Sequence, residues 1–258
     1  MPASAPLVCL HGWAMSAAVW QPLLGKLPIQ QSVTCPDLPG HGTAEPLECM
    51  DLDSIARALV AEVTRPAVWV GWSLGAMVAV HIARHYPDKV VGLVLLANTP
   101  RFVRTDDWSC AVDRKVFSDF AKELAQDYVR TLRRFLALQV LGSTTGDNMR
   151  DTIRQLQQQM NAPDPVALQQ GLDILLHTDQ RDDYRQLTVP VNCVLGSEDT
   201  LVPVSAGAAI NTLNQRIGIE YIDGAGHASL MSHSGVVARH IETLCAQVQQ
   251  QVARSIQE

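Results

Sequence analysis

The amino-acid sequence predicts an α/β fold, with a mostly parallel central sheet flanked by helices and interrupted by a helical insertion. The first observation is that short apolar runs alternate with amphipathic segments over the first hundred residues. This alternation is typical of β-α-β units, in which helices cover a sheet of parallel strands. The second observation is that strand-like runs stop after Pro100 and return only near Val189.

The individual elements follow from the spacing of apolar residues. Short apolar runs predict strands over residues 6–10, 31–35, 67–70, 90–96, 189–195 and 218–222. Helical spacing predicts helices over residues 19–27, 52–63, 74–85 and 234–251. The helix at 52–63 has two candidate N-caps, Asp51 and Ser54.

The middle of the chain differs in composition and in the spacing of its apolar residues. From Arg101 to Arg185, charged residues and glutamines are frequent, and apolar residues fall at helical spacing. We expect three or four helices there, at about 113–126, 128–141, 147–160 and 165–177. Residues 1–100 and 186–258 are therefore predicted to form an α/β core, and residues 101–185 a helical cap inserted into it.

Composition and charge exclude several classes of protein. Of the 258 residues, 47% are hydrophobic and 18% are charged, which excludes disorder, collagen-like repeats and coiled coils. The net charge of −6 argues against nucleic acid as a partner. Residues 66–83 are uncharged, but Gly71, Ser73 and Gly75 divide them into strand, turn and helix, so no membrane span is expected.

The remaining sequence features concern compartment and cofactors. Six cysteines are scattered without C-x-x-C spacing, and no secretory signal is visible, so we expect reduced thiols and a cytoplasmic location. No His, Cys and acidic residues cluster at metal-ligand spacing, and no phosphate loop or dinucleotide fingerprint is present. Neither a metal nor another cofactor is expected. We also expect the chain to act as a monomer.

The most informative motif is Gly71-Trp72-Ser73-Leu74-Gly75, which matches G-x-S-x-G between a predicted strand and a predicted helix. A tight turn of this kind holds the serine hydroxyl up at the edge of the sheet, and the glycines let neighbouring backbone approach closely. The start of the following helix favours developing negative charge. Ser73 is therefore the candidate nucleophile, and the alternative interpretation is a plain glycine-rich turn.

A nucleophilic serine needs a general base. His227 is preferred, because it lies in a loop of small residues directly after a predicted strand. His11 and His41 are loop histidines near the same edge of the sheet, and they remain its competitors.

The base in turn needs an orienting carboxylate and the reaction an oxyanion hole. Asp199 is the preferred acid, in the loop after the strand at 189–195, and the adjacent Glu198 is the alternative. The expected oxyanion donors are the backbone N–H of Leu74, directly after the nucleophile, and that of Trp13, in the loop after the first strand. The indole of Trp13 can also line the acyl pocket.

These motifs, in the order Ser73, Asp199, His227, resemble the α/β-hydrolase superfamily over nearly the whole chain. Within it, the chain resembles the pimeloyl-[acyl-carrier protein] methyl ester esterases of biotin synthesis. The closer resemblance rests on the turn at Ser73 and on two cap segments, 134–139 and 171–175. The chain departs from the family in two ways: the leading strands are expected to be short or absent, and Ala76 stands where a further glycine is common.

The resemblance implies a serine carboxylesterase that cleaves the methyl ester of a pimeloyl chain on acyl carrier protein and also hydrolyses simple short-chain esters. It implies the following substrate contacts: Trp13, Ser73, Leu74, Phe135, Leu136, Ala137, Leu138, Gln139 and His227. The open alternatives are a general short-chain carboxylesterase, another hydrolase or acyltransferase on the same fold, and a binding protein without catalysis.

A partner follows from the same resemblance. Acyl carrier protein is acidic, so a net-negative enzyme needs a local basic patch to bind it. The candidates are Arg130 and Arg134 on one predicted cap helix, and Arg150 and Arg154, spaced four residues apart, on the next. The alternative for each arginine is a solvated position on a helix.

Overall fold

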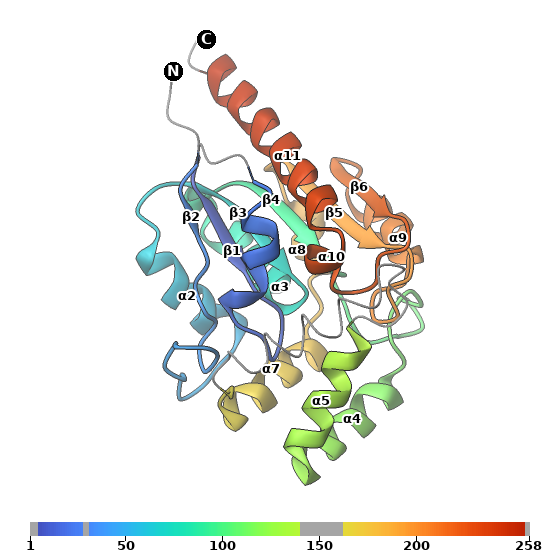
Figure 1. Ribbon diagram of the computed structural model, residues 1–258. Helices are drawn as coiled ribbons and strands as arrows, with labels where there is room; N and C mark the ends of the chain where they lie inside the picture. Colours follow the sequence, from blue (N-terminus) through green and yellow to red (C-terminus); the bar gives the residue numbers. More distant parts are fainter. Residues whose placement is uncertain (1–4, 28–30, 140–161, 256–258) are drawn as a thin grey trace.

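The computed structural model describes residues 5–27, 31–139 and 162–255. Its centre is a sheet whose described strands number six, in the order β2-β1-β3-β4-β5-β6 (Figure 1). Every neighbouring pair is parallel. The strands are β1 (Leu7–Leu10), β2 (Val33–Thr34), β3 (Ala67–Trp72), β4 (Val90–Leu96), β5 (Val191–Gly196) and β6 (Ile217–Ile222). The predicted α/β class with a parallel sheet is confirmed.

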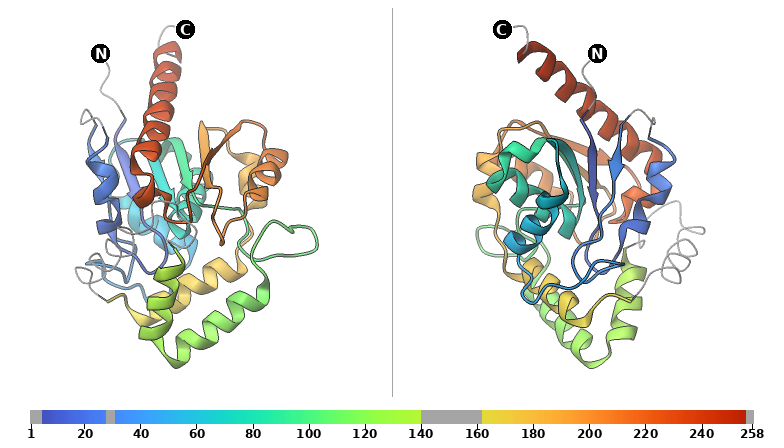
Figure 2. Two further views of the ribbon diagram at one scale, coloured as in Figure 1. Left: turned by 45° about the vertical axis from the view of Figure 1, so that its right-hand side comes forward. Right: turned by 90° about the vertical axis from the view of Figure 1, so that its left-hand side faces the viewer.

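Helices cover both faces of the sheet (Figure 2). They are the 3-10 helices η1 (Ala17–Trp20) and η2 (Pro87–Lys89), and α1 (Gln21–Leu24), α2 (Leu52–Glu62), α3 (Leu74–His85), α4 (Arg114–Gln126), α5 (Tyr128–Leu138), α7 (Pro165–His177), α8 (Arg181–Gln186), α9 (Ser205–Leu213), α10 (Ser229–Ser232) and α11 (Ser234–Ser255).

Side chains along β3 alternate between two apolar layers, as the pleat of a strand requires. Ala67 and Trp69 belong to the layer that includes α2, α3 and α9, whereas Val70 and Trp72 belong to the layer of α1, α10 and α11. All six residues of β3 are buried. The strand is therefore covered on both faces, which explains its unbroken apolar sequence.

Some elements differ from their predicted form. The helix predicted over 19–27 is split into η1 and the short α1, with Pro22 in the first turn of α1 and Gly25 at its end. The strand predicted over 31–35 keeps only two residues, and α8 and α9 were not predicted. The helix predicted over 147–160 lies outside the described residues. The two candidate N-caps of α2 act together. The Asp51 carboxylate accepts a hydrogen bond from the Ser54 amide, and the Ser54 hydroxyl oxygen accepts one from the Asp51 amide.

The helices α4, α5 and α7 lie together at the end of the molecule toward which the strands run (Figures 1 and 2). Arg181 links the segment before α4 to the segment after α7, because its guanidinium pairs with Asp107 at 2.8 Å and with Asp179 at 2.7 Å. The division into a core and a cap at residues 101 and 185 stays a prediction. Within the described ranges, no helix combines the length and the apolar character needed to cross a bilayer.

Candidate active site

Ser73 occupies a strained turn between β3 and α3. Its φ angle is +54°, in a region that residues other than glycine rarely adopt. The turn is held at its start, since the Ser73 amide donates to the Leu96 carbonyl at 3.0 Å. A Cβ atom on Gly71 would collide with the backbone of Ala76, and one on Gly75 with the carbonyl oxygens of Leu10 and His11. Both glycines of the motif are therefore needed for close backbone approach.

His227 and Asp199 form a buried hydrogen-bonded pair. The Nδ1 atom of His227 lies 2.8 Å from Oδ2 of Asp199, and both side chains are almost completely inaccessible to solvent. The other carboxylate oxygen of Asp199 accepts from the amides of Leu201 and Val202, at 2.8 and 2.9 Å. Glu198, the alternative acid, is exposed, and its carboxylate accepts from the Ser197 hydroxyl at 3.3 Å. The carboxylate beside His227 is thus that of Asp199.

The backbone of His227 is tied to the turn that carries Ser73. Trp72, the residue before Ser73, donates its indole N–H to the His227 carbonyl at 2.9 Å, and the two rings lie 5.8 Å apart. Because Nδ1 of His227 donates to Asp199, its Nε2 carries a lone pair. That Nε2 is buried and has no hydrogen-bond partner among the described residues. The imidazole can therefore accept a proton from a hydroxyl group presented to it.

His11 and His41, the competing bases, have both ring nitrogens occupied by backbone groups. Nε2 of His11 accepts from the Leu38 amide at 2.9 Å, and its Nδ1 donates to the Gly12 carbonyl at 2.8 Å. His41 accepts from the Ala14 amide at 3.3 Å and donates to the Pro39 carbonyl at 2.9 Å. Burial, together with the repulsion that the protonated forms of His11 and His41 would exert on each other, lowers the pKa of His11 to about 3. Both rings are neutral parts of the loop framework, with no nitrogen left for catalysis.

The loop that carries Trp13 lies against helices α4, α5 and α7. Its indole N–H donates to the Leu168 carbonyl of α7 at 2.8 Å. The Trp13 ring meets Phe135 of α5 edge-on at 4.9 Å and Phe120 of α4 at 5.6 Å. Leu74 is buried as the first residue of α3, where amide N–H groups lack partners within the helix. The arrangement joins Trp13, one of the two expected oxyanion residues, to an aromatic cluster.

The other expected substrate contacts are only partly described. Gln139 is buried. Its carbonyl accepts a hydrogen bond at 3.1 Å from the amide of Ala228, the residue that follows His227. The side chains of Leu136, Ala137 and Leu138 lie outside the described part of the structure. Sequence reasoning did not single out Phe120, although its spacing of three and four residues from Phe117 and Leu124 indicated an apolar face on that helix.

The expected docking arginines are also partly described. Arg130 and Arg134 are exposed on α5, and Arg134 pairs with Glu123 of α4 at 2.8 Å. Arg150 and Arg154 lie outside the described residues.

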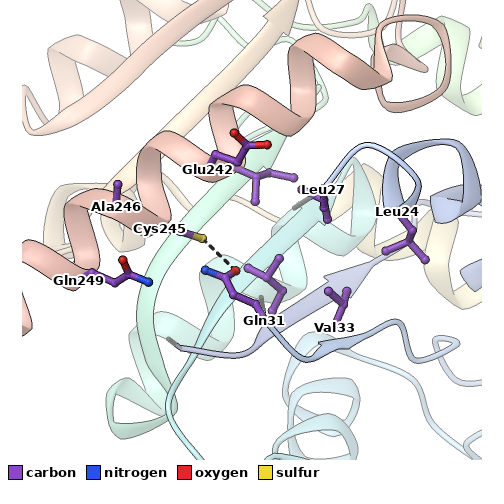
Figure 3. A pocket seen from close by; sticks show the side chains of 10 residues that line it. Leu24, Leu27, Gln31, Val33, Glu242, Cys245, Ala246 and Gln249 are labelled. Carbon is purple, nitrogen blue, oxygen red and sulfur yellow. Dashed lines mark hydrogen bonds between the residues drawn. The ribbon is translucent and has the colours of Figure 1, made fainter. Parts of the chain in front are cut away.

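A separate cavity of about 510 Å³ lies between α1 and α11 (Figure 3). It is lined in part by Leu7 and Val33, which begin β1 and β2. Ser73 instead follows the carboxyl end of β3, so the cavity is at the opposite end of the strands from the candidate site. Among the described residues, no group of three or more His, Cys, Asp or Glu side chains could hold a metal ion.

Comparisons with known proteins show the family of this chain. The sequence pattern of the alpha/beta hydrolase family matches residues 7–240. The pimeloyl-[acyl-carrier protein] methyl ester esterase of Xanthomonas axonopodis pv. citri is 41% identical over 251 residues, covering 94% of this chain and 95% of the relative. The enzymes of the same name from Xylella fastidiosa and Methylococcus capsulatus are each 39% identical, and each alignment covers 93% of this chain and 94% of the relative.

Solved structures show the same fold at lower sequence identity. A bromoperoxidase from Bacillus anthracis superimposes with a TM-score of 0.84 at 18% identity, covering 93% of this chain and 91% of that one. An esterase from Exiguobacterium antarcticum gives 0.81, also at 18% identity, covering 96% and 93%. The family match and the relatives named as esterases show together that this protein is a carboxylic ester hydrolase. The chain belongs to the alpha/beta hydrolase family, as do the pimeloyl-[acyl-carrier protein] methyl ester esterases that it resembles.

Proposed function

We propose that this protein hydrolyses the methyl ester of pimeloyl-[acyl-carrier protein], releasing methanol and a free carboxylate, in biotin synthesis. The observation that carries the chemistry is the buried His227–Asp199 pair tied to the Ser73 turn through Trp72. The proposed substrate is supported by the similarity to esterases of that name, at about 40% identity over more than nine-tenths of both chains.

The proposed mechanism uses Ser73 as nucleophile and His227 as base. Nε2 of His227 takes the hydroxyl proton while Oγ of Ser73 attacks the ester carbonyl. The backbone N–H groups of Trp13 and Leu74 stabilise the oxyanion. The protonated His227 then gives its proton to the departing methoxide, which leaves as methanol. Water, deprotonated by His227, attacks the acyl-enzyme. The imidazolium then returns the proton to Oγ of Ser73 as it leaves, and the products are the carboxylic acid and free Ser73.

Asp199 is proposed to hold His227 in the tautomer that this mechanism needs. Its carboxylate accepts a hydrogen bond from the Nδ1–H group and stabilises the imidazolium that forms during each half-reaction. The two amides that bind its other oxygen fix the carboxylate in place. No cofactor enters these steps.

Residues 101–185 are proposed to form the cap that holds the acyl chain. Phe135, with its edge-on contact to Trp13, and Gln139, next to the His227 loop, support this placement. Leu136, Ala137 and Leu138 complete the proposed contacts. Arg130 and Arg134, with Arg150 and Arg154, are proposed to bind the acidic carrier protein. We further propose that the protein is a monomer. We also propose that it works in a reducing compartment such as the cytoplasm, and the six free cysteines support this location.

The decisive experiment is hydrolysis of the carrier-bound methyl ester by the purified protein, followed by mass spectrometry of the carrier. We expect the pimeloyl carrier to lose the mass of one methylene group, and Ser73→Ala to abolish this change. A short-chain p-nitrophenyl ester serves as the comparison substrate. Turnover of that ester, with the carrier-bound ester left intact, would identify a general carboxylesterase and contradict the proposed substrate.

Carrier docking has its own test with a matched control. Arg134→Glu is expected to lower kcat/KM for the carrier-bound ester about tenfold or more at low salt and to leave the p-nitrophenyl ester unaffected. The substitution also breaks the pair with Glu123. The control is therefore Glu123→Gln, which breaks the pair but keeps the arginine charge. Equal losses in both variants would assign the effect to cap structure and not to docking.

A further inference from the structure

The indole of Trp13 lies in a slot on the surface of α7. One side of the slot is the Leu168 carbonyl, which accepts the indole N–H at 2.8 Å. The other is Gly171, one helical turn further along. A Cβ atom on Gly171 would lie 2.9 Å from Cδ1 of Trp13 and 3.4 Å from Cδ2 of Leu74. The side chains of both proposed oxyanion residues therefore meet at this single glycine.

The backbone gives no reason for glycine at this position. Gly171 is buried in the interior of α7 and is not among the glycines with positive φ. In a helix interior, glycine is less stabilising than alanine. The space that the missing Cβ leaves for the indole is the feature that offsets this cost.

The indole has little freedom to move away from a larger residue at 171. Trp13 is 2% exposed, and the rings of Phe120 and Phe135 also pack against it edge-on. Real side-chain carbons essentially never approach within 2.9 Å, so an added methyl group requires Trp13, α7 or both to shift. A shift that includes the Trp13 backbone would also move the proposed oxyanion N–H, because the same residue supplies it.

We propose that Gly171 is a positioning residue for the oxyanion hole: by omitting a Cβ, it lets Trp13 dock on α7 against Leu74 and so keeps the Trp13 N–H aligned. This inference rests on the oxyanion role proposed above for Trp13 and Leu74. The cap helix α7 is on this basis a fixed part of the catalytic framework, because it sets the position of a group that contacts the reacting oxygen.

The test compares Gly171→Ala with Gly235→Ala. Gly235 lies in α11, and a Cβ added there would meet nothing within 4 Å. The substrate is p-nitrophenyl acetate, whose acyl group is too short to probe the length of the pocket. We expect Gly171→Ala to lower kcat tenfold or more, with KM changed less than twofold, because a misplaced oxyanion donor acts on the transition state. Gly235→Ala is expected to keep wild-type kcat.

A second comparison keeps the test valid if Gly171→Ala folds poorly. Trp13→Phe replaces the indole by a smaller ring and frees the space that the new methyl group needs. Adding Gly171→Ala to Trp13→Phe is therefore expected to change kcat by less than twofold. A further tenfold loss in this double variant would overturn the proposal, as would wild-type kcat in Gly171→Ala. A rise in KM confined to longer acyl chains would also overturn it, since that result assigns Gly171 to the pocket wall.

The Ser73→Ala variant separates failure of this inference from failure of the proposed function. If Ser73→Ala abolishes turnover while Gly171→Ala leaves it intact, only the role of Gly171 is wrong. If turnover survives in Ser73→Ala, the proposed chemistry fails and the inference falls with it.

Discussion

His227 donates from Nδ1 to Asp199 across 2.8 Å, although the two residues are 28 positions apart in the chain. They meet because each lies in the loop that follows one of two adjacent parallel strands. β5 and β6 pair in register up to Gly196 and Ile222, so their loops leave the sheet at the same edge. Trp72, at the end of β3, then binds the His227 carbonyl from that edge. The contacts of these loops and of the turn at Ser73 lead to four testable predictions.

Asp199→Asn is expected to lower kcat by about 10³-fold while the protein stays folded. The amide oxygen can still accept from Leu201 and Val202, but the amide group in place of Oδ2 presents N–H to His227 and favours the wrong imidazole tautomer. Steady-state hydrolysis of a p-nitrophenyl ester measures the change. The control is Glu198→Gln, on the exposed neighbour, which is expected to retain wild-type kcat. A large loss in the control and not in Asp199→Asn would exchange the roles of the two carboxylates.

Trp72→Phe is expected to lower kcat about tenfold, because it removes the indole N–H that binds the His227 carbonyl at 2.9 Å. Trp69→Phe is the matched control. Trp69 lies on the same strand, is also buried, and donates to the Lys89 carbonyl at 3.0 Å, away from the site. Each variant is expected to lose about 1–3 kcal/mol of stability in urea unfolding. Equal kcat losses would show that Trp72 acts only through stability.

Gly75→Ala is expected to destabilise the protein by about 3 kcal/mol or more, since its methyl group would collide with the carbonyls of Leu10 and His11. These are backbone atoms that cannot rotate away. Gly25→Ala, where an added Cβ meets nothing within 4 Å, is the control and is expected to cost less than about 0.5 kcal/mol. Thermal unfolding compares the two. A wild-type melting temperature for Gly75→Ala would contradict the close backbone approach at the turn.

Stability is expected to fall as the pH is lowered from about 6.5 toward 3, in part because of His11. Burial and His41 lower the pKa of folded His11 to about 3, whereas an unfolded histidine titrates near 6.5. Between these values only the unfolded chain binds the proton, so the free energy of unfolding decreases by about 1.4 kcal/mol per pH unit. Above pH 6.5 the contribution is fully present.

The measurement is the slope of unfolding free energy against pH for the wild type and for His11→Asn. The variant is expected to show a shallower slope between pH 6 and 4, even though its overall stability is lower. The groups that face His11 are His41, with ring centroids 5.4 Å apart, and Asp37, with its carboxylate 3.9 Å away. Burial also lowers the pKa of His41, so protonation of His41 in the unfolded chain further decreases the free energy of unfolding as the pH falls. An unchanged slope would show that His11 is not the titrating group.

Much of the fold and the class of the site could be predicted from sequence. The alternation of apolar runs predicted the parallel sheet, and G-x-S-x-G predicted a strained turn at Ser73, because only certain residues tolerate these local conformations. Asp199 and His227 were predicted because each lies in a loop directly after a predicted strand. The local pattern favoured Asp199 but left its neighbour Glu198 as an alternative. Only the tertiary structure shows that the Asp199 side chain is buried and that Glu198 is exposed.

Only the tertiary structure decided which histidines are already occupied and why one helix contains a buried glycine. His11 and His41 are loop histidines near the same edge as His227, and the backbone amides that bind them come from Leu38 and Ala14. The fit of Trp13 against Gly171 joins residues 158 positions apart in the sequence. Local patterns encode the conformation of a segment, whereas the partners of a buried side chain depend on how distant segments pack, and that packing is settled only when the whole chain folds.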